Sequence, residues 1–341
     1  MSKFNQSKLI NALTRLGQQL SEPGDDLLEL INNEKQFNAW FTPESVQKAV
    51  LAIGASLNGA AIESWLSRYN LKDLDSPKNI GLILAGNIPL VGFHDALCVL
   101  VSGNNALIKA SSQDARLIKF VLEKLSEIET AFANRFKFVE RLTDFDAIIA
   151  TGSNNSSRYF DYYFGKVPNI IRKNRNSIAV LTGNETADQL KRLGNDIFTY
   201  YGLGCRNVSK LLVPDGYNFN FFFESIENYQ PIINHHKYNN NYDYNKSIYL
   251  VNSDQHLDNG FLLLKKDERL ASPLAVLFYQ NYTNLEDAQN QINEQSAHIQ
   301  CVVSKLPLAT KNQVVDFGKS QQPDLWDYAD GVDTLTFLQS L

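Results

Sequence analysis

Sulfur is scarce in this chain of 341 residues, which contains three cysteines and one methionine. Cys98, Cys205 and Cys301 are odd in number, lie far apart and form no CxxC pair. That pattern argues against a disulfide framework and against a structural zinc site. Each thiol therefore has to be interpreted by itself.

Long apolar runs are also missing. No segment approaches the roughly 20 apolar residues needed to span a bilayer, and the first seventeen residues lack the apolar stretch of a signal peptide. We therefore expect a cytoplasmic protein with no membrane span.

Positive charge is not in excess, since the formal net charge is −5 at pH 7. A nucleic acid partner is not expected, and an anionic ligand would have to be held by local charge. The apolar fraction of 44% is typical of a globular protein with one large domain or two ordinary ones.

The first seventy or so residues show helical spacing of apolar positions, as at Leu9, Leu13 and Leu16. A long helix is predicted over residues 46–69, bent at Gly54 or Gly59. From Asn79 onward, short apolar runs alternate with helical segments, which predicts a parallel sheet with helical crossovers. The Asn- and Tyr-rich residues 218–245 are predicted to form an ordered loop, followed by a strand at SIYLVN.

A GxGxxG fingerprint is absent from the ends of these predicted strands. Three strand ends instead run into small polar residues: AGN at 85–87, KASS at 109–112 and TGS at 151–153. Ligands of open α/β sheets bind at the carboxyl ends of strands, so these three clusters could line one crevice.

In this order, the motifs resemble those of the aldehyde dehydrogenase superfamily, particularly its acyl-CoA reductase branch, the LuxC-type fatty acid reductases. AGNIPL resembles the family's Asn-x-Pro element, NNALIKASS its cofactor-binding strand, ATGS its pyrophosphate turn, and GLGC its Gly-x-x-Cys motif around the nucleophile. The resemblance implies an α/β fold with a Rossmann-like parallel nucleotide-binding sheet, an α/β catalytic domain and a helical N-terminal region. We expect the helical region at 1–75, packed on the nucleotide-binding domain at 76–182. The catalytic domain is expected at 183–310, with a C-terminal segment, 311–341, returning toward the cofactor domain.

Cys205 differs from the other two cysteines in its surroundings. Cys98 and Cys301 lie in apolar runs and are predicted to be core residues, whereas Gly202 and Gly204 permit close approach to Cys205, and Arg206 adds a charge that could favour a thiolate. By resemblance, Cys205 is the nucleophile. Asn87 and the Cys205 amide would then stabilise the oxyanion that forms on thiolate addition. The alternative for Asn87 is a turn residue before Ile88-Pro89.

A glutamate that activates water in the oxidising members of the superfamily has no counterpart here. Its position falls near Ile171 or Arg172, and Glu185 follows the next strand and does not match it. Without a general base, an acyl-enzyme would survive water long enough for hydride delivery. The resemblance thus implies an acyl-CoA reductase that forms an aldehyde.

The cofactor contacts implied by the resemblance are Lys109 and Ser112 for the adenosine ribose and Thr151, Gly152 and Ser153 for the pyrophosphate. A second ribose contact falls at Glu268 or, by strict count, at Arg269. Ser111 and Ser112 stand where enzymes that prefer NAD often carry a glutamate, so NADPH is expected in preference to NADH.

Arg172, Lys173 and Arg175 form a basic cluster that could bind CoA phosphates or could be a solvated charged face. No metal site is expected, because the adjacent His235 and His236 lack a third ligand. The expected partner is acyl-CoA, with a homodimer and an acyl-supplying protein as open alternatives. Rival functions are aldehyde oxidation, acyl-phosphate reduction and a non-redox acyl carrier or interaction protein with the same fold.

Overall fold

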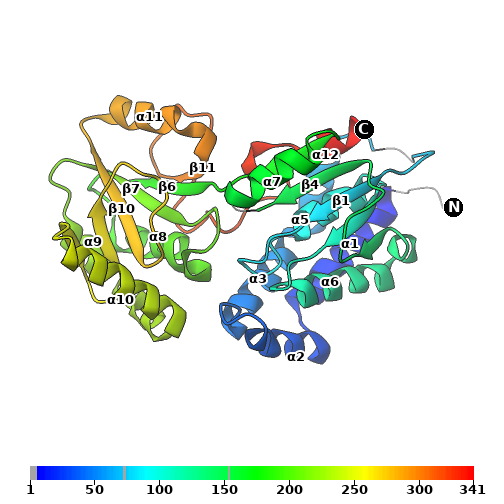
Figure 1. The fold of residues 1–341 in the computed structure, drawn as a ribbon, viewed down its shortest axis with the longest axis horizontal. Helices are drawn as coiled ribbons and strands as arrows, with labels where there is room; N and C mark the ends of the chain where they lie inside the picture. The colour runs from blue at the N-terminus through cyan, green and yellow to red at the C-terminus, as the bar shows by residue number, and fades with distance from the viewer. Residues whose placement is uncertain (1–5, 72–73, 153) are drawn as a thin grey trace. The chain divides into compact units, whose positions relative to one another are not determined.

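The chain forms two compact units, each built around a sheet of its own (Figure 1). The computed structural model describes residues 6–71, 74–152 and 154–341. Unit 1 contains the chain up to Asn174 together with Asp324–Leu341, and unit 2 is the continuous segment Arg175–Pro323.

Unit 1 has a five-stranded sheet of order β3-β2-β1-β4-β5, in which every neighbouring pair is parallel. The carboxyl ends of all five strands therefore lie at the same edge. The strands are β1 (Asn79–Ile83), β2 (Asn105–Lys109), β3 (Phe136–Phe138), β4 (Ala147–Thr151) and β5 (Asn169–Arg172).

The helices of unit 1 and its sheet share one hydrophobic core, and the C-terminal segment completes that core with Leu325, Leu335 and Leu338. A buried hydrogen bond of 2.8 Å from Trp65 Nε1 to Tyr328 Oη ties this segment to the N-terminal helices. The α-helices are α1 (Gln6–Ser21), α2 (Asp25–Asn33), α3 (Pro43–Ser56), α4 (Gly59–Leu66), α5 (Phe93–Val101), α6 (Ala115–Ile128), α7 (Asn154–Phe164) and α12 (Thr334–Gln339), with 3-10 turns η1 (Glu34–Gln36), η2 (Thr130–Phe132) and η6 (Ala329–Gly331).

The long helix predicted over residues 46–69 is interrupted at Leu57. Asn58 starts a new helix there, because its side chain accepts a hydrogen bond from Ala61 N, and α3 and α4 meet at 65°. Within the described part of the chain, no single helix is long and apolar enough to cross a membrane, although α3 and α4 pass that test of length and composition when taken together as a bent pair.

Unit 2 has a seven-stranded sheet of order β12-β11-β6-β7-β10-β9-β8. Its neighbouring pairs are parallel except for β8 with β9, so β8 is an antiparallel edge strand. The strands are β6 (Asn176–Val180), β7 (Val208–Pro214), β8 (His256–Asp258), β9 (Leu263–Lys266), β10 (Val276–Tyr282), β11 (Ile299–Val303) and β12 (Gln313–Val315).

The tract at 218–245 is helical, so the prediction of a loop followed by a strand at SIYLVN was wrong. Tyr238, Tyr242, Asn245 and Tyr249 are buried at spacings of four, three and four, which places them on one face of a helix. The helices of unit 2 are α8 (Ala187–Phe198), α9 (Phe219–Ser225), α10 (His236–Val251) and α11 (Leu285–Glu294), with 3-10 segments η3 (Thr199–Gly202), η4 (Glu227–Asn234) and η5 (Ser296–His298).

The boundary between the units differs from the one inferred from the sequence. It falls between Asn174 and Arg175, so β6 belongs to the sheet of unit 2 rather than to a domain ending at residue 182. The return to unit 1 begins at Asp324, and the expected C-terminal segment, 311–341, is therefore divided between the units.

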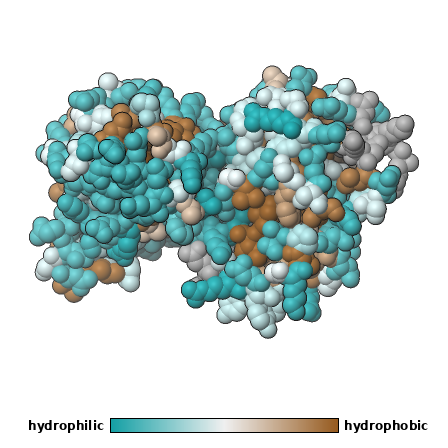
Figure 2. Space-filling model, turned by 90° about the horizontal axis from the view of Figure 1, so that it is seen from above, coloured by the Kyte–Doolittle hydropathy of each residue, from teal (hydrophilic) through white to brown (hydrophobic). Residues whose placement is uncertain are grey.

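The surface seen in Figure 2 is mainly hydrophilic, with apolar residues gathered in separate patches. The large apolar and aromatic side chains that are most exposed include Tyr159, Tyr162 and Tyr163 on α7 in unit 1 and Leu250 and Val251 at the end of α10 in unit 2.

Candidate active site

Three polar loops follow neighbouring strands at one edge of the sheet of unit 1. Ile83 at the end of β1 pairs with both Lys109 on β2 and Ala150 on β4, so the three strand ends are level. The motifs AGN and KASS, with Thr151 and Gly152 of TGS, therefore lie along this edge. Ser153 lies outside the described residues.

The loop that carries Asn87 is tied to its surroundings by its backbone. Leu84 N donates to Lys109 O over 3.1 Å, and Asn38 Nδ2 donates to Gly86 O over 3.4 Å. Asn87 itself is exposed. The residue thus stands on an anchored loop at the sheet edge, where a carboxamide N–H could reach a ligand.

The same loop rests on a buried carboxyl group that the sequence analysis missed. Leu90 has a φ of 58°, and its N–H donates to Asp114 Oδ2 over 2.7 Å. Burial raises the pKa of Asp114 well above its usual range, and it also raises the pKa of Glu34. Arg116 Nε lies 3.5 Å from Glu34 Oε1 and partly offsets that effect. Asp114 and Glu34 are therefore two buried carboxyl groups of unit 1 whose charged forms are disfavoured.

Lys109 and Ser112 are exposed at the end of β2 and in the loop that follows it. Lys109 Nζ donates to Glu140 O over 2.9 Å, so the ammonium group is held at the sheet edge rather than buried. Gly86 packs closely on this loop, because a Cβ at Gly86 would lie 2.5 Å from Ser111 Oγ. The two loops form one closely packed surface on which a cofactor could lie.

Cys98 and Cys301 are buried, as predicted, and Cys205 is exposed. Burial raises the pKa of the Cys98 thiol and that of the Cys301 thiol, so both are held in the neutral form. Of the three, Cys205 is the thiol that a substrate can reach.

Cys205 lies on a turn between η3 and β7, at the amino end of the strand. Earlier in the same loop, Tyr200, Tyr201 and Gly202 have φ values of 53°, 58° and 80°. Two consecutive non-glycine residues in the left-handed region are strained, and such strain persists only where the surroundings impose it. The loop is therefore held in its shape by tertiary contacts.

Ser177 links the candidate nucleophile to the buried Cys301. Its hydroxyl donates to Cys205 O over 3.0 Å, accepts from Cys301 N over 3.2 Å and lies 3.1 Å from Cys301 Sγ. Ser177 is fully buried at the start of β6, where the pairing of β6 with both neighbouring strands shifts register. At these irregularities the Ser177 hydroxyl reaches both Cys205, just before β7, and Cys301 on β11.

Arg206 interacts with groups on two neighbouring strands, β12 and β11. Its Nη1 donates to Gln313 Oε1 over 3.0 Å, and its charge lowers the pKa of Cys301, opposing the larger effect of burial. These interactions connect the loop that carries Cys205 to β11 and β12.

Glu185 is not placed to act as a base on Cys205. β6 and β7 are parallel, with Ser177 paired to Val208 and Val180 to Leu212. Cys205 precedes β7 whereas Glu185 follows β6, so the two residues lie at opposite ends of the sheet, about 15 Å apart along the strands. The Glu185 carboxylate also accepts hydrogen bonds from Thr182 N and Gly183 N.

Arg172 stands near the position at which the oxidising members of the superfamily carry their glutamate. Its side chain is buried. Its Nη2 lies 2.6 Å from Asp95 Oδ1, and its Nε donates to Asp95 Oδ2 over 3.2 Å. Further hydrogen bonds reach Ala329 O and Thr334 Oγ1. The guanidinium is 4% exposed, which corrects the expectation that it binds a CoA phosphate.

The basic cluster expected around Arg172 therefore does not form. Lys173 is exposed and pairs with Asp161 over 3.5 Å, while Arg175 donates to Ile299 O over 3.4 Å within unit 2. Lys173 is the most exposed of the three residues, and Arg175 is half-buried.

Glu268 lies on a segment, 267–275, that connects the parallel strands β9 and β10 without a helix. It is exposed, and its carbonyl oxygen accepts a hydrogen bond of 2.6 Å from Lys210 Nζ. The neighbouring Arg269 makes a bidentate contact with Asp267 and lies over the ring of Phe278. The position that strict counting assigns to a carboxylate is thus occupied by an arginine that is already paired.

Lys210 is buried in β7, five residues after Cys205. Its Nζ donates to Glu268 O and to Gln280 Oε1, both over 2.6 Å, and burial lowers its pKa to about 8. The sequence analysis missed Lys210 and Ser177. A lysine within the apolar run NVSKLLVP is the one signal that could have identified Lys210, whereas nothing in the sequence marks Ser177.

No group of three or more potential metal ligands occurs among the residues that the structure describes. His235 instead accepts a hydrogen bond from Tyr238 N at the start of α10, and its ring packs 4.3 Å from that of Tyr201. His94 is half-buried in unit 1, where its Nε2 donates to Leu325 O over 2.9 Å.

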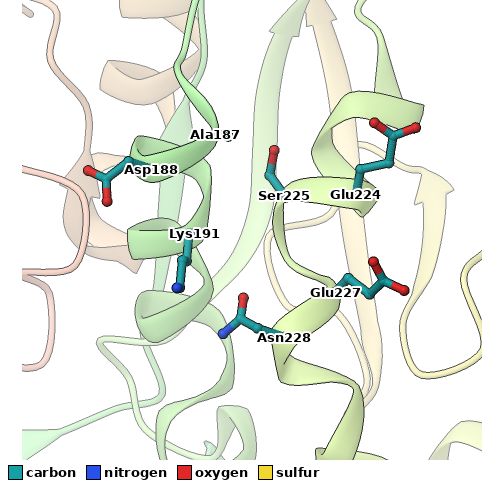
Figure 3. Close-up of a pocket in the computed structure, with 7 residues that line it drawn as sticks. All are labelled: Ala187, Asp188, Lys191, Glu224, Ser225, Glu227 and Asn228. Atoms are coloured by element: carbon teal, nitrogen blue, oxygen red, sulfur yellow. The ribbon is translucent and has the colours of Figure 1, made fainter.

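A pocket of about 660 Å³ lies on unit 2 between the start of α8 and the segment that joins α9 to η4 (Figure 3). It is lined by polar and charged side chains, three of them carboxylates. α8 runs from this pocket toward η3, so Cys205 follows the far end of the helix. The pocket is therefore separate from the nucleophile loop.

Comparisons with known proteins agree with this arrangement. A model of the family described as "Acyl-CoA reductase (LuxC)" matches residues 32–312. Among solved structures, aldehyde dehydrogenase 21 from Physcomitrella patens is similar with a TM-score of 0.70 at 12% identity, over 99% of this chain and 84% of that one. An oxidoreductase from Marinobacter aquaeolei has a TM-score of 0.68 at 10% identity, covering 95% and 80%.

An aldehyde dehydrogenase from Mycobacterium tuberculosis, complexed with NAD+, has a TM-score of 0.65 at 12% identity, covering 91% and 77%. At these identities the likeness shows the fold. A search of curated protein sequences gives no significant match.

Proposed function

Because this chain belongs to the acyl-CoA reductase (LuxC) family, an NAD(P)-dependent oxidoreductase family of the aldehyde dehydrogenase fold, we propose that it reduces an acyl-CoA thioester to an aldehyde through an acyl-enzyme on Cys205. The observation that carries the proposal is the exposure of Cys205 on a strained, anchored loop while the other two thiols are buried.

In the first step, the Cys205 thiolate attacks the thioester carbon and CoA leaves as a thiolate that takes up a proton. One thioester replaces another, so this exchange is close to thermoneutral. We assign to Asn87 and to the Cys205 N–H the role of donors to the oxyanion. Asn87 is exposed on an anchored loop, which supports a role in binding.

In the second step, a nicotinamide cofactor held at the sheet edge that carries Lys109 and Thr151 would supply the hydride that reduces the acyl group. The oxyanion formed on Cys205 then collapses: the carbon–sulfur bond breaks, the aldehyde leaves, and Cys205 is restored as the thiolate. Hydrolysis competes poorly, since Arg172 is buried and paired where the oxidising relatives place their glutamate, and Glu185 lies at the other end of the sheet.

The cofactor in this proposal is NADPH in preference to NADH. Lys109 would contact the adenosine ribose, and the absence of a carboxylate at Ser112 leaves room for a 2′-phosphate. Thr151 and Gly152, at the end of β4, would contact the pyrophosphate. Glu268 and the exposed Lys173 are proposed as further contacts to the nicotinamide ribose and to CoA.

The deciding measurement is intact mass after the protein is mixed with a panel of acyl-CoAs without nicotinamide. We expect an acyl adduct that is absent in Cys205→Ala, is retained in the matched variant Cys301→Ala, and is discharged by NADPH. An adduct that NADPH does not discharge would favour a non-redox acyl carrier. No adduct with any thioester, or one that persists in Cys205→Ala, would refute the proposed mechanism.

A further inference from the structure

Asn207 is a buried residue at the centre of the loop that carries Cys205, and only 2% of it is exposed. Its Oδ1 accepts a hydrogen bond of 2.8 Å from Gly204 N, and its own N–H donates to Gly204 O over 3.0 Å. Asn207 thus binds both the N–H and the carbonyl group of Gly204, the residue just before Cys205.

The other end of the same carboxamide faces the end of helix α8. Asn207 Nδ2 lies 3.1, 3.3 and 2.8 Å from the carbonyl oxygens of Asp196, Ile197 and Thr199. Carbonyl groups at a helix C-terminus lack intrahelical partners and carry partial negative charge. Asn207 therefore satisfies these oxygens and separates them from the Cys205 loop.

Aspartate and serine, the side chains nearest in shape, cannot perform both functions of the carboxamide. An aspartate could still accept from Gly204 N, but it would offer the three carbonyl oxygens no donor and would add a negative charge beside them. A serine is too short to reach both ends. The strained residues Tyr200 and Tyr201 lie between the two anchored ends, which explains how the loop holds them in the left-handed region.

We propose that Asn207 is the positioning residue of the nucleophile: it fixes the loop that presents Cys205 and shields the thiolate from the negative end of α8. The inference rests on the proposed function only in taking Cys205 as the reactive thiol. Asn207 acts through Gly204 and through the end of α8 rather than by contact with substrate.

The test is the rate of alkylation of Cys205 by iodoacetamide between pH 6 and pH 10, followed by intact mass. We expect Asn207→Asp to move the midpoint of the rate profile upward by about one pH unit or more, because a nearby negative charge disfavours the thiolate. Asn312→Asp is a matched control, since Asn312 Nδ2 also donates to two backbone carbonyls, Ser296 O and Ile299 O. It should keep the wild-type midpoint.

A folded Asn207→Asp protein with the wild-type midpoint, or with a shift equal to that of Asn312→Asp, would overturn the proposal. If Asn207→Asp does not fold, Asn207→Ser replaces it, and we expect alkylation at least about tenfold slower at pH 8 through loss of positioning. A wild-type rate in that variant would equally overturn it. Alkylation needs neither acyl-CoA nor nicotinamide, so its outcome is independent of the outcome for the proposed reaction.

Discussion

Among the described residues, each unit has one buried basic side chain, which lies on a strand of its sheet, and the two charges are held in different ways. Arg172 in unit 1 forms a bidentate pair with the carboxylate of Asp95, whereas Lys210 in unit 2 donates to two neutral oxygens, Glu268 O and Gln280 Oε1. The pKa of Arg172 is raised despite its burial, because Asp95 opposes the effect of desolvation. The pKa of Lys210 is lowered to about 8, because burial exceeds the effects of Asp267 and Glu268.

This comparison indicates what each cation contributes. Arg172 and Asp95 join β5, α5 and the C-terminal segment at Ala329 and Thr334, so the pair closes unit 1. Lys210, which follows Cys205 by five residues, instead holds the carbonyl group of Glu268. Burying its ammonium group costs solvation free energy, which a carboxylate partner would have offset. A lysine whose pKa is lowered by burial is typical of functional sites.

The largest effect is expected from breaking the pair in unit 1. Arg172→Met leaves Asp95 buried without a partner, and we expect the free energy of unfolding of unit 1 to fall by about 3–5 kcal/mol. The matched variant is Lys173→Met, which removes the adjacent exposed pair and should change stability by about 1 kcal/mol or less. Urea unfolding followed by circular dichroism measures both. Equal losses in the two variants would contradict the role given to Arg172.

The second prediction supplies Lys210 with the counter-charge that it lacks. With a folded-state pKa of about 8 and an unfolded value near 10.4, the unfolded chain binds more protons between these pH values. The free energy of unfolding should therefore rise with pH across that window, by at most about 1.4 kcal/mol per unit. Gln280→Glu should raise the pKa of Lys210 and remove this slope.

The measurement for Lys210 is urea unfolding at pH 7, 8, 9 and 10 in the wild type, Gln280→Glu and Lys210→Met. Lys210→Met should lack the slope as well, because it has no group to titrate. A slope that survives in Lys210→Met would assign it to another residue.

The smallest effect is expected on cofactor binding, from a substitution at Ser112 in the loop that follows Lys109. Ser112→Glu places a carboxylate where a 2′-phosphate is proposed to bind, and we expect KM for NADPH to rise about tenfold, or about 1.4 kcal/mol, with KM for NADH little changed. Ser112→Gln is the control of similar size without the charge. Equal changes for both cofactors would contradict the placement of the 2′-phosphate.

Much of the fold was predictable, because strand and helix periodicity are local properties of the sequence. The parallel sheet of unit 1 and the burial of Cys98 and Cys301 follow from apolar runs in the sequence. Residues 218–245 were assigned wrongly because asparagine and tyrosine have weak helix propensity, and the burial of Tyr238 and Tyr249 on one face overrides it.

The candidate site was less predictable where it depends on contacts between distant residues. Arg172 and Lys173 are neighbours in sequence, yet Arg172 is buried and Lys173 is exposed. The side chains of β5 alternate between the two faces of the sheet, and this alternation directs Arg172 toward Asp95. Asn207 and Ser177 are ordinary polar residues in the sequence. Their positions matter because strand pairing and the end of α8 bring the Cys205 loop to them.

The division of the chain has a consequence for how the protein is made. Unit 2 is continuous, but unit 1 lacks Asp324–Leu341 until the whole of unit 2 has been synthesised. Until then Trp65 has no Tyr328, and Arg172 has neither Ala329 nor Thr334. Domains generally fold as the chain emerges, N-terminal parts first. Here the order is reversed: the nucleophile loop can reach its final form on the ribosome before the first residues of the chain complete theirs.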